Sequence, residues 1–95
     1  MREPSFEWDE AKNRQNVQKH GIDFRDVVAM FDRPMVSFLD QRSDYNEDRW
    51  VGIGLLKAMT AVVVFTERSE DTIRIISARK AKRHEEIIYR NEIQD

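Results

Sequence analysis

The stretch that decides the fold is residues 60–80, TAVVVFTERSEDTIRIISARK. Residues 60–66 carry β-branched side chains on both faces of an extended chain, which is typical of a central strand. Residues 72–78 predict another strand, and the polar segment 67–71 separates the two. Because so short a connection joins antiparallel neighbours, this stretch predicts a β-hairpin inside a sheet.

Two more strands are predicted before this hairpin. Residues 35–39 form the first of them, and residues 40–46 form a polar loop after it. Residues 47–55 form the next strand, in which Gly52 and Gly54 allow close packing. The chain from residue 35 onward therefore predicts four antiparallel strands.

The segment before these strands has two helical patterns. Asp9 before residues 10–20 and Gly21 after them are typical of an N-cap and a C-terminal glycine. Asp23 then begins a second, shorter helix. Its apolar residues recur at the spacing of one helix face: Phe24, Val27, Val28 and Phe31.

A last helix is predicted over residues 80–93, with Ile88 on the side that packs on the sheet. The order of elements is then ααββββα. It predicts an α+β fold, a four-stranded antiparallel sheet with helices packed mainly on one face. A length of 95 residues suits a single domain, residues 1–95.

Composition excludes several kinds of protein. The absence of cysteine excludes disulfides, thiolate metal sites and cysteine nucleophiles. The longest apolar run, residues 61–65, is too short for a membrane span or a signal peptide, so we expect a cytoplasmic protein without membrane contact. His20 and His84 are isolated, and no nucleotide-binding glycine loop is present, so we expect neither a metal nor another cofactor.

Basic side chains gather near the end of the chain, although the net charge is −2. Residues 74–83 contain no acid, and they contain the basic residues Arg74, Arg79, Lys80, Lys82 and Arg83. Such a cluster raises a local positive potential even on an acidic protein. A solvated strand and helix surface would have the same composition.

Arginines from neighbouring strands could meet at one patch: Arg49, Arg68, Arg74 and Arg79. Planar guanidinium groups suit phosphate oxygens, so the patch favours RNA as a ligand. Candidate groups for proton transfer are Glu47, Lys19 and His20. Candidate surfaces for base stacking are Tyr45, Trp50 and Tyr89. Together these residue types could cleave RNA without a metal.

Each of these residues also has a structural interpretation. Glu47 and Arg49 could form a row of ion pairs, and the arginines near residues 74–79 could pair with acids of the helices. His20 could be a cation that stabilises a helix end. Trp50 and Tyr89 could pack on the sheet instead of meeting bases. The residues alone leave both interpretations open.

Three motifs carry a resemblance to a known family: Phe6-Glu-Trp-Asp9, Tyr45-Asn-Glu-Asp-Arg49 and Arg74-Ile-Ile-Ser-Ala-Arg79. In content, order and separation they resemble the BrnT family, the toxin half of a bacterial type II toxin-antitoxin pair. The resemblance implies a RelE-like fold and a ribonuclease activity that blocks translation. It also implies a ribbon-helix-helix antitoxin of the BrnA type, which binds the toxin and, with it, operator DNA.

The resemblance and the residue chemistry together give the candidate site. The candidate catalytic residues are Glu47, Arg49, Arg68, Arg79 and His20. The candidate RNA-binding residues are Lys19, Arg74, Lys80 and Arg83. The alternative function is a non-catalytic module that binds a partner and acts with the antitoxin in operon repression.

Overall fold

The computed structural model describes residues 3–42 and 46–94. Its strands are β1 (Ser5–Glu7), β2 (Met35–Leu39), β3 (Trp50–Leu56), β4 (Met59–Ser69) and β5 (Thr72–Lys80). Its helices are α1 (Glu10–His20), α2 (Phe24–Val27), a 3₁₀ helix (Val28–Asp32), α3 (Arg83–Tyr89) and a π-helical turn (Arg90–Gln94). In the described part of the chain, no helix is both long and apolar enough to cross a membrane.

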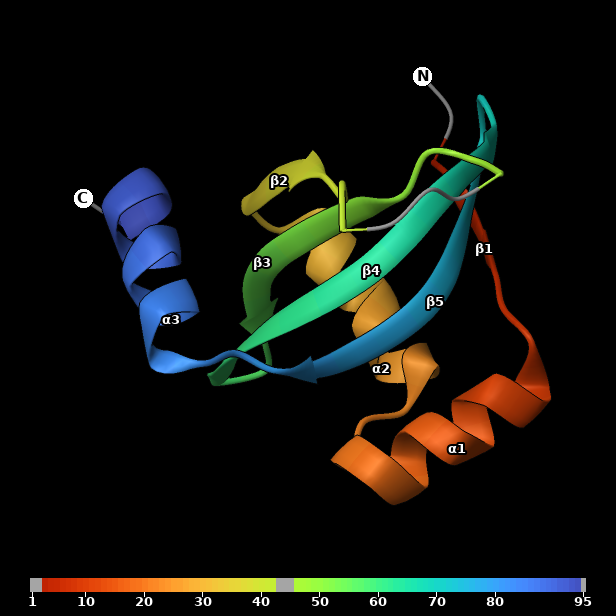
Figure 1. Cartoon of the computed structure of the whole chain (residues 1–95), viewed down its shortest axis with the longest axis horizontal. Coiled ribbons are helices and arrows are strands. Elements are labelled where there is room, and N and C mark those ends of the chain that lie inside the picture. Colours follow the sequence, from red (N-terminus) through yellow and green to blue (C-terminus); the bar gives the residue numbers. More distant parts are fainter. Residues whose placement is uncertain (1–2, 43–45, 95) are drawn as a thin grey trace.

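The strands form one five-stranded mixed sheet in the order β1-β5-β4-β3-β2 (Figure 1). The pairs β2/β3, β3/β4 and β4/β5 are antiparallel, whereas β1 runs parallel to β5. The α+β class stands, but the four-stranded antiparallel sheet in the order ααββββα is wrong. The missing strand is β1, which has three residues and so offers no periodicity. Ser5 of β1 pairs with Thr72 of β5, which lies far along the chain.

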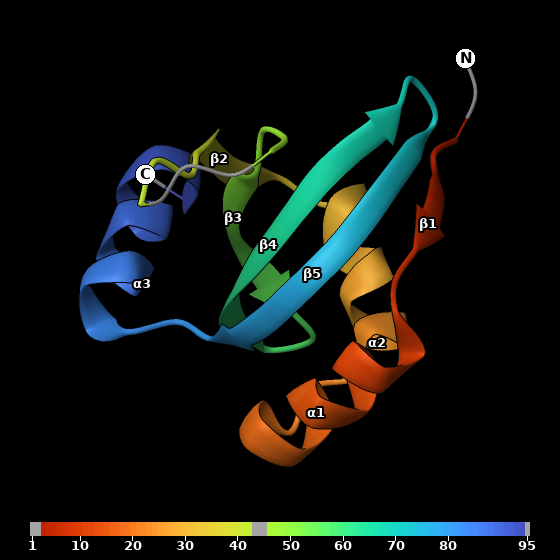
Figure 2. The same ribbon diagram turned by 45° about the vertical axis from the view of Figure 1, so that its right-hand side comes forward.

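Apolar side chains enter two cores, one on each face of the sheet. Phe24, Met30 and Val63 belong to the first core, which α2 and the 3₁₀ helix cover. Val62 and Tyr89 belong to the second core, which α3 covers. The expectation that the helices pack mainly on one face is therefore wrong. Because β4 is apolar on both faces, each face needs its own cover, and α3 lies apart from α1 and α2 (Figure 2).

The helix α3 packs on the sheet through a different side than its sequence predicts. Tyr89 is buried, and Ile88 remains 38% exposed. The helix is also shorter than the predicted 80–93, because β5 continues to Lys80 and the chain after Tyr89 forms the π-helical turn. Ile88 is therefore not a core residue, which corrects the prediction.

The helix α1 begins and ends where its sequence predicts. The Asp9 carboxylate accepts hydrogen bonds from the Ala11 and Lys12 N–H groups, at 2.8 and 3.1 Å. Gly21 closes the helix with a φ of 71°, a left-handed conformation that glycine adopts without strain. These local signals fix the helix independently of the rest of the chain.

Two buried amides attach α1 to the sheet and to α2. The Asn16 Oδ1 accepts a 3.1 Å bond from the Ala78 N–H of β5, and its Nδ2 donates a 2.9 Å bond to the Ile22 carbonyl. The Asn13 Oδ1 accepts a 2.9 Å bond from the Phe24 N–H. Since α1 has few apolar residues, these bonds hold it beside β5 and set the position of its exposed lysines.

Candidate functional site

The register of β4 and β5 brings a set of polar residues to one face. Val62 pairs with Arg79, Val64 with Ser77, and Thr66 with Arg74. Residues directly opposite each other in an antiparallel pair share a face, so these side chains lie on the same face as α3. We call the surface formed by Val64, Thr66, Arg74, Ser77 and Arg79 the β4–β5 face.

Arg79 is held firmly at one end of this face. Its Nη1 and Nη2 donate to the two carboxylate oxygens of Glu85 in α3, at 2.8 and 2.7 Å. Glu85 also accepts a 2.7 Å bond from the Lys82 N–H at the start of the helix. The Glu85 side chain is 12% exposed and that of Arg79 is 32% exposed. Such a forked pair fixes the plane of the guanidinium.

This environment shifts the pKa of both partners. Hydrogen bonds from Arg79, and then from the Lys82 N–H, lower the pKa of Glu85 from its ordinary 4.5 to about 2, against the opposing effect of burial. The hydrogen bonds to Glu85 raise the pKa of Arg79, against the smaller lowering effects of burial and of the Arg42 charge. Glu85 therefore stays ionised at neutral pH and acts as a fixed partner, not as a proton acceptor.

The low pKa of Glu85 predicts an acid-dependent loss of stability. A lowered pKa in the folded state adds stability above the unfolded value of 4.5, and that stability is lost as the pH falls toward about 2. We expect Glu85→Gln to lower the free energy of unfolding by roughly 2–3 kcal/mol at neutral pH. Denaturant unfolding from neutral pH down to about pH 2 should show this difference shrink.

Glu86→Gln is the matched control for this measurement. Glu86 is the next residue in α3 and has no part in the Arg79 ion pair. A Glu85→Gln deficit that stayed constant down to about pH 2 would contradict the assignment of the lowered pKa to this pair.

Three further candidate residues lie on or beside this face. Arg74 Nη1 donates a 2.9 Å bond to Glu7 Oε2 on the neighbouring strand β1. The Thr66 hydroxyl donates a 2.6 Å bond to the Asp48 carbonyl, which ties the segment before β3 to the face. That segment carries Glu47 and Arg49, whose Oε2 and Nε atoms lie 3.9 Å apart. The structure thus brings Glu47 and Arg49 to the same side of the sheet as Arg74 and Arg79.

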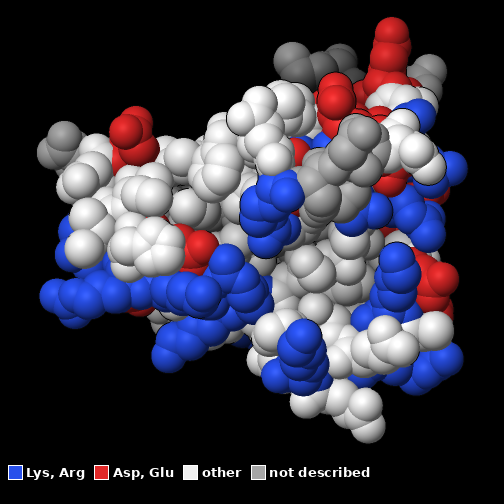
Figure 3. Space-filling model, in the orientation of Figure 1, with Lys and Arg blue, Asp and Glu red and all other residues white. Residues whose placement is uncertain are grey.

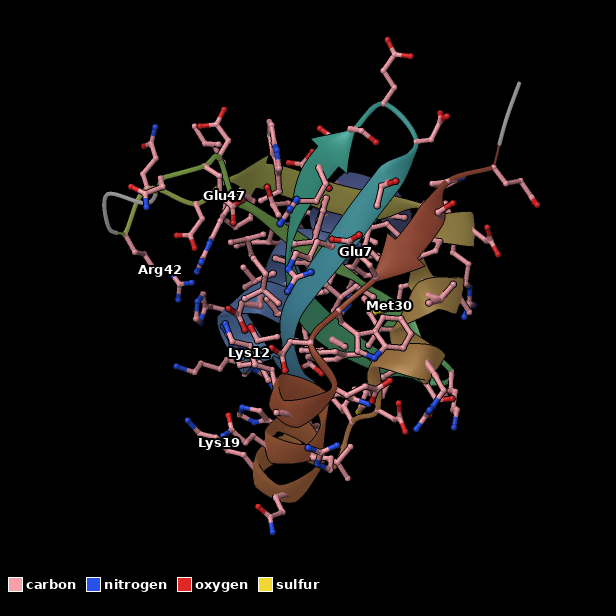
Figure 4. All side chains as sticks on the ribbon, turned by 90° about the vertical axis from the view of Figure 1, so that its right-hand side faces the viewer. Glu7, Lys12, Lys19, Met30, Arg42 and Glu47 are labelled. Atoms are coloured by element: carbon pink, nitrogen blue, oxygen red, sulfur yellow. The ribbon has the colours of Figure 1, made fainter. Side chains whose placement is uncertain are left out.

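Lys19 and His20 lie at a different border of the face. With Lys12 they line a groove of about 210 Å³ between α1 and β5, whose β5 wall includes Ser77. Figure 4 shows Lys12, Lys19 and Arg42 on one side of the sheet and Met30 on the other. Basic groups therefore border the β4–β5 face both at α1 and near Arg42.

Three candidate residues lie away from the centre. Lys80 pairs with Ala61 of the first core, so it lies on the face opposite to Arg79. Arg68 is exposed in an irregular part of β4 near the β4–β5 turn, beyond Thr66. Arg83 is exposed at the first position of α3. The nine candidate residues therefore do not form one compact cluster.

Two of the candidate stacking residues pack in the protein interior, and the third lies outside the described residues. Trp50 packs against the first core. Tyr89 is 4% exposed in the second core. Tyr45 lies outside the described residues. For Trp50 and Tyr89 the structural interpretation is confirmed.

Sequence reasoning expected acids of the helices to pair with Arg74 and Arg79, and Glu85 of α3 confirms this for Arg79, but it did not name the carboxylates. Glu85 follows Arg79 by six residues across the junction of β5 and α3, and its position as the third residue of a helix was a usable signal. Asp40 binds Arg42 through two bonds of 2.8 Å, and its side chain is 1% exposed. The role of Glu7 required knowledge of β1, which periodicity could not reveal.

The charge on this side of the molecule is mixed but contains large basic regions. Figure 3 shows Lys and Arg side chains around the junction of β5 and α3 and again over α1, with a less charged surface between them. Across residues 3–42 and 46–94, no three histidine or acidic side chains group in a way that would hold a metal ion. Arg49, Arg74 and Arg79 supply positive charge on and beside the β4–β5 face, and Glu47 is an exposed acid next to Arg49.

Comparisons with known proteins agree with this fold. Residues 8–85 match the family described as "Ribonuclease toxin, BrnT, of type II toxin-antitoxin system". The 1.1 Å crystal structure of the Brucella abortus ribonuclease toxin BrnT is similar, with a TM-score of 0.69 and 27% sequence identity; the match covers 84% of this chain and 99% of that chain. A comparison with curated proteins gives no match. Because the family match spans most of the sequence, the chain belongs to the BrnT family of type II toxin-antitoxin ribonuclease toxins.

Proposed function

We propose that this protein cleaves RNA on the β4–β5 face. The observation that carries the proposal is the fixed guanidinium of Arg79. Among the described residues, its hydrogen bonds to Glu85 and to the Lys80 carbonyl use Nη1 and Nη2 and leave the Nε–H group available. A guanidinium held in place with one free edge is suited to a phosphate oxygen.

The reaction requires an attack within the RNA chain. A base removes the proton of a ribose 2′-hydroxyl, the 2′-oxygen bonds to phosphorus, and the bond from phosphorus to the 5′-oxygen breaks. An acid protonates the departing 5′-oxygen, which leaves a 2′,3′-cyclic phosphate and a 5′-hydroxyl end. Charge builds up on the phosphate oxygens during the transition state, and preorganised cations lower the barrier most at that point.

The residues of the face divide among these roles. Arg79 and Arg49 stabilise the charged phosphate, and Arg74 holds a neighbouring part of the RNA. Glu47, whose side chain is 40% exposed, is the candidate base. His20, at the α1 border of the face, is a second candidate for proton transfer, and Arg68 and Arg83 extend the positive surface at its two ends. Lys19 contributes a phosphate contact at α1.

Three finer features complete the proposal. The reaction proceeds without a metal because the side chains supply both proton transfer and charge stabilisation. Cleavage of RNA in the cytoplasm blocks translation. A BrnA-like ribbon-helix-helix antitoxin neutralises the toxin and links it to operator DNA.

A specific observation favours a second function. Arg74 and Arg79 are both engaged by carboxylates of the same chain, at 2.9 and 2.7 Å, which reduces the positive charge available to RNA. A non-catalytic module that binds a partner through this face, and acts with the antitoxin in operon repression, would not need arginines that are available to RNA. The two functions differ in what the protein does when it is produced alone.

Expression in bacteria without an antitoxin tests the proposal. We expect growth arrest and a fall in the incorporation of labelled amino acids, because cleaved RNA cannot be translated. Coexpression of a ribbon-helix-helix protein encoded beside the toxin should restore both. Normal growth and normal incorporation, with soluble folded protein in the cells, would favour the non-catalytic function instead.

A further inference from the structure

The groove between α1 and β5 is a distinct feature beside the β4–β5 face. It has a volume of about 210 Å³, and its helical wall includes Lys12, Lys19 and His20. Its strand wall includes Ile76 and Ser77. Lys12, Lys19 and His20 are exposed, and no acidic side chain belongs to the described lining. The helical wall of the groove therefore carries positive charge.

The spacing of the two lysines suits an extended polyanion. Lys12 and Lys19 are seven residues apart, so they lie on one side of α1, about 10 Å apart along its axis. Asn16 lies between them on the same side, and its bond to the Ala78 N–H fixes that side of the helix against β5. The two ammonium groups thus extend along the groove from a rigid support.

The groove opens onto the β4–β5 face. Ser77 belongs to both, since it lines the groove and pairs with Val64. An irregularity in the pairing of β4 and β5 follows Val64, which places the bulged Ile76 at the groove wall. The groove and the β4–β5 face therefore meet at Ser77.

We propose that the α1–β5 groove binds a second part of the RNA strand, with Lys12 and Lys19 holding backbone phosphates next to the nucleotides on the β4–β5 face. The inference rests on the proposed function in taking RNA as the ligand. It extends the binding surface along α1 to Lys12, beyond the contact already assigned to Lys19. Contacts to phosphates would carry no base preference, so the groove sets the direction and register of the strand.

An acidic segment of the antitoxin could also meet two lysines. RNA is favoured because the groove has cations along its helical wall, lacks a large apolar patch and meets the β4–β5 face at Ser77. A protein segment would gain most of its affinity from apolar anchors, and among the described residues of this groove the apolar side chain is that of Ile76. Binding of an antitoxin is therefore an alternative that the experiment must separate.

The test compares Lys12→Ala/Lys19→Ala with Arg14→Ala. Arg14 is on the same helix but about 200° around it from Lys12, so it is a cation matched in exposure and on the opposite side. The probe is a single-stranded RNA oligonucleotide with 2′-O-methyl groups, which lacks the attacking hydroxyl and stays intact. Binding is measured by fluorescence anisotropy at several salt concentrations, after circular dichroism has shown that each variant is folded.

We expect the double variant to bind the RNA more weakly than the unmodified protein does. We also expect its affinity to depend less on the salt concentration. Each lost phosphate contact on a single strand makes the negative slope of log K against log salt less steep by about 0.7, so the loss of two contacts makes it less steep by about 1.4. Arg14→Ala should keep the slope of the unmodified protein. An unchanged slope in the double variant would overturn the inference, and so would an unmodified protein that does not bind the RNA.

The outcomes separate the groove from the proposed function. If the double variant binds RNA normally while the unmodified protein cleaves RNA, the groove inference and the phosphate contact assigned to Lys19 are wrong, and the proposal of RNA cleavage on the β4–β5 face stands. If the salt slope falls in the double variant but the unmodified protein does not cleave RNA that carries 2′-hydroxyl groups, the groove binds RNA and the cleavage proposal is wrong. If the double variant keeps its RNA slope and loses affinity for the antitoxin, the groove belongs to the antitoxin and the inference is overturned.

Discussion

Replacement of Arg79 by alanine should lower the rate of RNA cleavage about 10²- to 10³-fold, the usual loss when one preorganised donor to a charged transition state is removed. The Arg79 guanidinium is fixed by two bonds to Glu85, so it needs little reorganisation when the phosphate charge develops. The effect should appear in kcat/KM, measured with purified protein and an RNA oligonucleotide. Growth arrest in cells should disappear with it.

Two other variants make this result interpretable. Arg33→Ala removes an exposed arginine that follows the 3₁₀ helix, and it should leave the cleavage rate unchanged. Arg79→Lys keeps a positive charge near Glu85 but loses the planar fork, so it should fold better than Arg79→Ala and still cleave slowly. An Arg79→Ala protein that is folded and retains the rate of the unmodified protein would remove Arg79 from the site.

Replacement of Phe24 by alanine should lower the free energy of unfolding by about 3–5 kcal/mol, which is a large part of the stability of a domain this size. Phe24 is fully buried in the first core, and its ring packs edge-on against Trp8 at a centroid distance of 6.1 Å. The Asn13 amide, which binds its N–H, would keep the backbone in place around a cavity. Denaturant unfolding followed by circular dichroism measures the loss.

Phe38→Ala is the matched control for Phe24→Ala. Phe38 is 45% exposed on the edge strand β2, so its removal should cost less than about 1 kcal/mol. Equal losses in the two variants would show that the first core does not lie where the structure has it.

Local signals in the sequence were sufficient for some elements. Asp9 and Gly21 define both ends of α1 through bonds within a few residues, and the structure has the same helix. The hairpin of β4 and β5 was also predicted, because β-branched residues on both sides of a short polar segment leave few alternatives. These elements need no knowledge of the remaining fold.

Other features depend on distant contacts. The strand β1 gains its hydrogen bonds from β5, and three residues alone have no pattern to recognise. The helix α3 covers a different face from α2, which depends on how β5 leads into it and not on its own periodicity. Glu85 becomes the partner of Arg79 only when α3 folds back toward β5. For the same reason, the sequence could not show that Lys80 lies on the opposite face from Arg79.

The most direct test of the account is to incubate the purified protein with RNA in the presence of excess EDTA and to determine the chemistry of the new ends. The account predicts cleavage in EDTA, with 2′,3′-cyclic phosphate and 5′-hydroxyl ends from the unmodified protein and almost none from Arg79→Ala. RNA that stays intact in EDTA and is cleaved only when a divalent metal is added would contradict it.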